Sequence, residues 1–256
     1  MLSPTENEAM NRTRLIHRLG PIVILASMAG MTLGQEVAPE TTVTETNRAE
    51  FFAKFAVADY DAPLPENPDE LAQRRIKGQR YDNSSWVAKN PNPDADYARR
   101  SLAIQPISAF PIEDSDVVVI GLAIGVSAYL SNDKTGVYSE YTIRVEQVLK
   151  DGGSRNLMAG STITMDRAGG AVRYPDGHKV AYFIAERKLP VVGTMYALFL
   201  RDDKRSKSFD IVTLYELKRD SVVPVDSGYS FEEVRGMTKS AFIKTVQEKV
   251  VKRSDD

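Results

Sequence analysis

The residues best suited to bind a ligand surround a pair of glycines, Gly169-Gly170. Four side chains near this pair could contact a partner: Arg167, Arg173, Tyr174 and His178. Arginine and histidine donate hydrogen bonds to anions, and a tyrosine ring offers an apolar face. If the loop folds back on its domain, we expect these residues to bind a protein, a glycan or another anionic ligand. The alternative is a charged hairpin tip without a ligand.

The sequence predicts no catalytic site. Ser127 lies in Gly-Val-Ser-Ala-Tyr, which lacks the second glycine of a serine-hydrolase elbow. His178, which would have to serve as the base, follows a Pro-Asp-Gly turn, where a solvated histidine is expected. A hydrolase that uses Asp166 with Glu140 across paired strands is the alternative, and it requires the two carboxylates to converge in one pocket.

Metal and cofactor sites are not expected either. The chain has no cysteine and only two histidines, whereas zinc takes three or four ligands that are commonly His or Cys. Asn132 and Asp133 lack the spacing of a calcium loop and indicate a hairpin turn. The formal net charge of −2 lacks the basic excess of nucleic-acid-binding proteins, so we expect no nucleic-acid partner.

Residues 1–34 have the pattern of a secretory signal peptide. Basic residues precede an apolar run over 21–33, and small residues follow at Ala29, Gly30 and Gly34. The pattern predicts an exported protein, periplasmic or extracellular, that starts at Met1 or Met10 and is cleaved after Ala29 or Gly34. If the segment stays uncleaved, it becomes a membrane anchor.

Residues 35–111 are rich in proline and predict a partly ordered N-terminal extension with short helices. One helix is expected over 48–58, and a second begins after Asn67 and ends at Gly78. The basic residues near its end indicate a solvated helix terminus or, alternatively, a patch for nucleic acid or an anionic surface: Arg74, Arg75, Lys77 and Arg80. Three aromatic residues are expected to hold the extension on the folded domain: Tyr81, Trp86 and Tyr97.

Residues 112–256 predict a β-rich domain that ends in a helix after Thr238. A β-branched run over 116–130 contains Gly121 and Gly125, which indicate bulges, and its even-numbered apolar residues are expected on one face. Residues 138–150 alternate as a half-buried strand, and several shorter strands follow. Five or six strands in meander order favour a small OB-like barrel, with a small open sandwich as the alternative.

Several stretches in this domain resemble secreted bacterial proteins of uncharacterised function that have an OB- or netrin-like barrel. They include Glu113–Val119, Ala128–Ser131, Val137–Tyr141, Arg167–Gly170, Pro190–Gly193 and Tyr196–Leu200. The resemblance covers residues 113–226 and implies the fold and export, but no catalytic residue. The function expected from the sequence is therefore a non-enzymatic binding or scaffolding module of the cell envelope or extracellular space. The exported hydrolase and the anchored envelope protein are the alternatives.

Overall fold

The computed structural model describes residues 45–101, 107–152, 155–227 and 229–254. The predicted signal segment and both predicted cleavage positions lie outside these ranges. Among the described residues, none of the helices combines the length and apolar character needed to span a membrane. The chain is mainly β-structured, as the sequence predicts.

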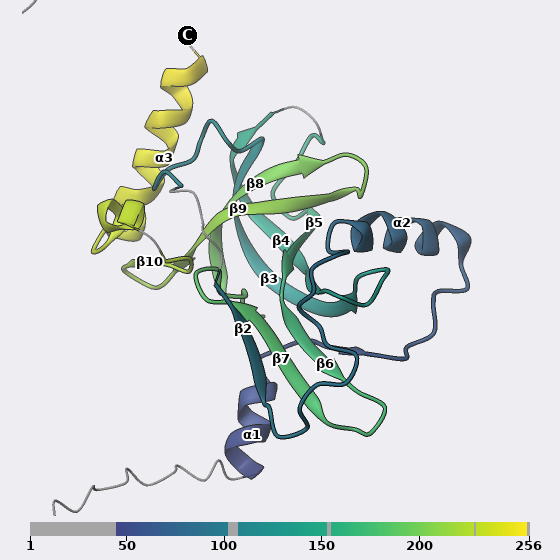
Figure 1. Cartoon of the computed structure of the whole chain (residues 1–256). Coiled ribbons are helices and arrows are strands. Elements are labelled where there is room, and N and C mark those ends of the chain that lie inside the picture. Colours follow the sequence, from purple (N-terminus) through teal and green to yellow (C-terminus); the bar gives the residue numbers. More distant parts are fainter. Residues whose placement is uncertain (1–44, 102–106, 153–154, 228, 255–256) are drawn as a thin grey trace, which may run out of the picture. The chain divides into compact units, whose positions relative to one another are not determined.

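Five strands form the ring of a small barrel (Figure 1). They are β3 (Val117–Leu130), β4 (Val137–Asp151), β5 (Thr162–Ala168), β8 (Met195–Asp203) and β9 (Ser208–Leu217). Pairing runs β3–β4–β5–β9–β8 and returns to β3. All neighbours are antiparallel except β5 and β9, whose parallel pairing covers only Met165 with Phe209 and Asp166 with Asp210. The predicted OB-like barrel is confirmed, although its strands do not follow a simple meander order.

The long first strand is irregular where the glycines predict it. Its register against β4 shifts between Ile120 and Gly121 and again between Ala123 and Gly125. The first shift is an extra residue in β4, whereas the second inserts Ile124 into β3 itself and reverses the alternation of its faces. Ile124 is 45% exposed. Val118 and Ile120 pack with α3, whereas Val126 packs in the barrel interior, so the expectation that all even-numbered residues share one face is wrong.

A second sheet contains four strands in the order β1–β6–β7–β2. The β6–β7 hairpin, Gly170–Arg173 and Lys179–Ile184, follows the third barrel strand. Parallel strands from the proline-rich region flank it: β1 (Val57–Asp59) on β6 and β2 (Tyr97–Arg100) on β7. Two short strands of the proline-rich region thus pair with strands of the domain expected from residue 112. Three- and four-residue strands fit between prolines and satisfy backbone groups that hairpin edges would otherwise expose.

Three α-helices are described: α1 (Glu45–Phe52), α2 (Pro68–Gln79) and α3 (Lys239–Ser254). Helix α1 ends earlier than predicted, because the chain enters β1 at Val57. Helix α2 begins where predicted, and the Asn67 side chain accepts hydrogen bonds from the backbone N–H groups of Asp69 and Glu70. Thr238 caps α3 through a bond from Ala241 N, 3.2 Å. A short 3₁₀ helix, η1 (Tyr229–Val234), follows β10 (Val222–Pro224), which extends the barrel sheet beside β9.

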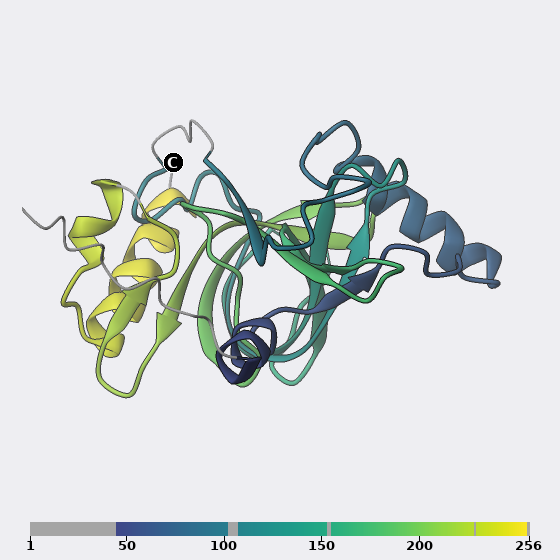
Figure 2. The same ribbon diagram turned by 60° about the horizontal axis from the view of Figure 1, so that its bottom comes forward.

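Three apolar clusters fix the barrel, helix α3 and the second sheet. The barrel interior draws on all five strands, with Val119, Ile143, Met165, Leu198 and Phe209 among its buried members. Helix α3 covers one outer face with Phe242 and Val246, and Figures 1 and 2 show it and α2 on opposite sides of the barrel strands. The third cluster joins the second sheet to the ends of β3 and β4.

Candidate functional site

Arg167 lies apart from the other residues predicted to bind a ligand. Its guanidinium donates to both carboxylate oxygens of Asp226, at 2.6 and 2.8 Å, and to the carbonyl of Lys188. Both side chains of the ion pair are about 5% exposed or less, 4% for Arg167 and 5% for Asp226. Thr213 also donates to Asp226. Arg167 therefore anchors the chain after β10 onto the barrel and does not reach the surface.

The other three predicted residues meet at the β6–β7 hairpin. Arg173 forms an ion pair with Asp59 of β1. The buried Tyr174 contacts the carbonyl of Ala88 and the hydroxyl of Tyr182, and His178 stacks on its ring with centroids 4.6 Å apart. The structure gives all three of them partners within the chain. Ligand binding by these residues remains a prediction.

Glu140 and Asp166, the pair required by the hydrolase alternative, do lie on one face. They are directly opposite in the β4–β5 register, but neither of them lines the pocket beside α2. Each is bound by a cation from the proline-rich region: Lys77 pairs with Glu140, and Arg80 pairs with Asp166. The Asp166 side chain is 0% exposed, so in this arrangement a substrate has no access to its carboxylate.

Arg80 occupies an acidic socket formed by Asp166, Asp203 and Asp210 of β5, β8 and β9. Its guanidinium binds all three, with 3.2 Å to Asp203. Ser208 Oγ, at 2.7 Å, and the Tyr81 hydroxyl also donate to Asp166. Burial opposes the charge on Arg80, but the carboxylates and Tyr81 outweigh it and raise its pKa above the usual range. Burial raises the pKa of Asp210 in the same socket, although Arg80 lowers it in part.

Stacked rings continue from the socket along the outer face of the barrel. Tyr81 stacks on Tyr138 with centroids 4.5 Å apart and planes at 11°. Tyr138 contacts Tyr129 at 5.7 Å, and the guanidinium of Arg74 lies 3.1 Å above the Tyr129 ring. Tyr138 is fully buried, and burial raises its pKa well above the usual value. Helix α2 and the turn after it are therefore held by aromatic packing as well as charge.

The turn between β3 and β4, residues 131–136, holds the same segment from its other side. Asp133 accepts a 2.7 Å hydrogen bond from Asn83 N, and Asp82 accepts one from Asp133 N at 3.1 Å. Asn132 donates to the carbonyl of Arg75 at 2.9 Å. A Cβ added at Gly136 would lie 2.4 Å from the carbonyl oxygen of Tyr81. Backbone contact this close requires glycine at position 136.

These contacts define two complementary parts. The docking segment is residues 67–85, which include α2, and the receptor face comprises β4, β5, the 131–136 turn and the β8–β9 hairpin. OB barrels bind ligands on their second and third strands and on the loops that join the first strand to the second and the fourth to the fifth. In this barrel those elements are the receptor face. The chain's own docking segment covers the surface that OB barrels use for ligands.

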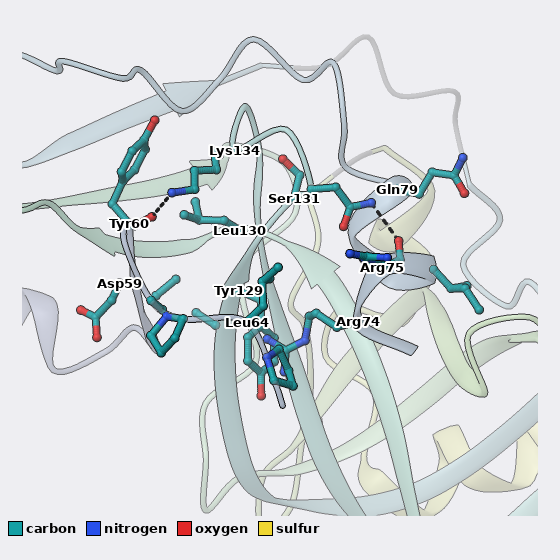
Figure 3. Close-up of a pocket in the computed structure, with 17 residues that line it drawn as sticks. Asp59, Tyr60, Leu64, Arg74, Arg75, Gln79, Tyr129, Leu130, Ser131 and Lys134 are labelled. Carbon is teal, nitrogen blue, oxygen red and sulfur yellow. Dashed lines mark hydrogen bonds between the residues drawn. The ribbon is translucent and has the colours of Figure 1, made fainter. Parts of the chain in front are cut away.

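A pocket of about 490 Å³ opens beside the docking segment (Figure 3). Its walls come from residues 58–65, from α2, and from the end of β3 with the following turn. Figure 3 shows Arg74 beside the Tyr129 ring and Lys134 donating to the carbonyl of Tyr60. Neither Glu140 nor Asp166 lines this pocket.

The acidic socket was not predicted, and Lys77 and Arg80 do not belong to the solvated helix end or anionic-surface patch expected from the sequence. Lys77 and Arg80 instead bind barrel carboxylates. Asp166 was the available signal, because a carboxylate between Met165 and Arg167 in an apolar strand requires a counter-ion if it is buried. Of the aromatic residues expected to hold the extension, Tyr81 and Trp86 pack on barrel and sheet tyrosines, and Tyr97 packs on Phe183.

Within the described ranges, no group of three His, Asp or Glu side chains is arranged to hold a metal ion. The three carboxylates of the acidic socket surround a guanidinium instead. No protein-family model matches this chain, and no curated protein is significantly similar to it.

Proposed function

We propose that this chain is an exported, non-enzymatic binding module whose receptor face recognises a basic helical segment of a protein. The observation that carries the proposal is the acidic socket, in which three carboxylates from three strands hold Arg80 on the ligand-binding surface of an OB-like barrel. The docking segment occupies this face in the resting state.

Charge determines the class of partner. Four carboxylates mark the receptor face, Glu140, Asp166, Asp203 and Asp210, and each of them contacts a cation of the docking segment. Such a surface repels phosphate backbones and favours a peptide with Lys and Arg. The stacking of Tyr81 on Tyr138 adds a preference for an aromatic residue next to the arginine.

Covalent linkage gives the docking segment an advantage over any partner. A tethered segment has an effective concentration of about millimolar for a short linker, so a free peptide of equal affinity competes poorly. The face is then available only when the docking segment is released. The module therefore binds partners weakly in its resting state and more tightly after release.

The exported location rests on the signal-like pattern over residues 1–34. N-terminal sequencing of the protein recovered from fractionated native cells tests it. A start after Ala29 or Gly34 supports export, whereas an intact N-terminus in the membrane fraction favours the anchored alternative.

The binding proposal is tested with a labelled peptide of residues 66–86. It is titrated against the wild-type chain and against a Lys77→Gln/Arg80→Gln chain, in which the resident segment loses its ion pairs with the barrel. We expect the peptide to bind the double variant at least about tenfold more tightly than the wild type. A peptide with the same two substitutions serves as the ligand control, and Arg99→Gln, an exposed arginine of β2, as the protein control.

Equal binding to both chains, or equal binding of the two peptides, contradicts the proposal. Circular dichroism checks that the double variant is folded. If it is not, the Lys77→Gln chain, which retains the acidic socket, replaces it with the same expected direction.

A further inference from the structure

The pocket between the docking segment and the barrel has the dimensions of a small-molecule site. Its volume is ≈ 490 Å³, within the range of about 300–1,000 Å³ that is typical of ligand pockets. Much of its lining is apolar, including Pro63, Leu64, Pro65, Ile76, Ala128 and Leu130. Leu64 at its rim is 63% exposed, so a ligand that covers this side chain removes apolar surface from water.

The charged residues of the lining are predominantly basic. Asp59 is already bound by Arg173 through two hydrogen bonds. Lys134 donates to the carbonyl of Tyr60 at 2.7 Å and lies 3.4 Å from Asp61. The other two basic residues of the lining are Arg74 and Arg75.

Arg74 and Arg75 form no ion pair with any described carboxylate. The guanidinium of Arg74 rests on Tyr129 at 3.1 Å (Figure 3). Stacking shields one face of the guanidinium from water and leaves its N–H donors, which lie in the plane, able to bind an oxyanion in a bidentate manner. A guanidinium without a counter-ion therefore borders an apolar cavity.

We propose that this pocket binds an amphipathic organic anion, with a carboxylate, sulfonate or phosphate head on Arg74 and an apolar body against Leu64 and Ile76. Arg75, at the exposed edge of the same helix, adds long-range attraction for the head group. The site uses none of the four receptor-face carboxylates. It goes beyond the proposed function and does not require that a partner segment ever binds.

Fluorescence titration of the full chain with 8-anilinonaphthalene-1-sulfonate tests the site, with neutral N-phenyl-1-naphthylamine as the uncharged probe. We expect saturable binding of the sulfonate and binding of the neutral probe that is weaker by about tenfold. Arg74→Gln removes this preference by weakening the sulfonate about tenfold and leaving the neutral probe unchanged. Leu64→Gln weakens both probes, and Arg99→Gln weakens neither.

Equal affinity for the two probes, or an Arg74→Gln chain that binds the sulfonate as well as the wild type, overturns the proposal. Urea unfolding of Arg74→Gln confirms that it is folded, and the exposed Leu64 offers a second variant with little risk to the fold. Displacement of the sulfonate by decanoate supports an aliphatic acid as ligand, and displacement by 2-naphthoate supports an aromatic one. If neither acid displaces the sulfonate, the assignment of an amphipathic organic anion to this pocket is overturned. The peptide titration contains no probe, so its result does not depend on these outcomes. Each of the two proposals can therefore fail without the other.

Discussion

Arg80 and Asp166 are 86 positions apart in the sequence, and their ion pair fastens the docking segment to the third strand of the barrel. Asp166 has a fully buried side chain, and that of Arg80 is 24% exposed. A carboxylate at this depth depends on its counter-ion, because desolvation penalises an unpaired charge. The pair therefore couples the stability of the barrel to the position of the docking segment.

Replacing Arg80 by Gln removes this counter-ion from three carboxylates. We expect the free energy of unfolding to fall by about 3 kcal/mol, the range for a buried pair that loses one partner. Arg235→Gln, at an ion pair whose arginine is 75% exposed, should cost about 0.5 kcal/mol or less. Urea unfolding of both variants measures the difference, and similar losses would show that the acidic socket is not a buried ion-pair site.

Gly136 provides a test of how tightly the docking segment fits. Alanine there places a Cβ 2.4 Å from the Tyr81 carbonyl and 2.9 Å from Ser84 Oγ, so the segment must move away from the turn. We expect Gly136→Ala to cost about 1–3 kcal/mol of stability and to accelerate tryptic cleavage after Lys77 and Arg80. Mass spectrometry of the early fragments measures the cleavage.

Gly177→Ala is the control for this test. Gly177 has φ of +89° with no atom within 4 Å of an added Cβ, so alanine there introduces backbone strain but no contact with the docking segment. Cleavage at the segment should stay at the wild-type rate. Faster cleavage in both variants would indicate a general loss of stability and contradict the specific role of Gly136.

Asp133 predicts a dependence of stability on pH. Burial raises the pKa of its carboxyl, but hydrogen bonds from Asn83 N, Thr135 and Ser131 outweigh this effect, and the net pKa lies well below the usual value. A depressed pKa in the folded state stabilises the fold above the unfolded-state pKa of about 3.9, and this contribution is lost as the pH falls through the folded-state pKa. The affected window therefore lies below about pH 4.

Asp133→Asn should thus be less stable than the wild type at neutral pH, and the difference should shrink as the pH falls below about 4. Urea unfolding from neutral to acidic pH measures it. Asp220→Asn, at an exposed position, is the matched control. A difference for Asp133→Asn that is constant with pH would contradict a role for its ionised carboxylate.

Local features of the fold were predictable because their causes lie within a few residues. Asn67 followed by Pro68 specifies the start of α2, and Gly121 and Gly125 each lie at a register shift between β3 and β4. The residues that follow a bulge were harder to place. Only a residue inserted into β3 itself, Ile124, exchanges its two faces, and which strand takes the extra residue depends on the pairing with β4.

The receptor face was not predictable from the sequence alone. Arg80 meets Asp210 across 130 positions, and no local pattern specifies a partner that far away. The same holds for β1 and β2, which are short strands defined by the hairpin edges they join and not by their own composition. Arg167 is a residue for which a local pattern was misleading. Its position beside a glycine pair indicated a surface site, but in the structure it forms a buried ion pair with Asp226.

The two proposed sites share the docking segment, and this predicts coupling between them. The pocket has walls from both α2 and β3, so a bound anion stabilises the docked state and must oppose a peptide that displaces the segment.

We expect the peptide of residues 66–86 to bind the wild type more weakly when the pocket is saturated with the sulfonate probe. Linkage requires the peptide to weaken sulfonate binding by the same factor. Isothermal calorimetry in both orders of addition measures the two factors. At the same probe concentration, the Arg74→Gln chain, which binds the sulfonate more weakly, should show a smaller effect of the probe on peptide affinity. If saturating the pocket left the peptide affinity of the wild type unchanged, the segment would leave the receptor face without opening the pocket.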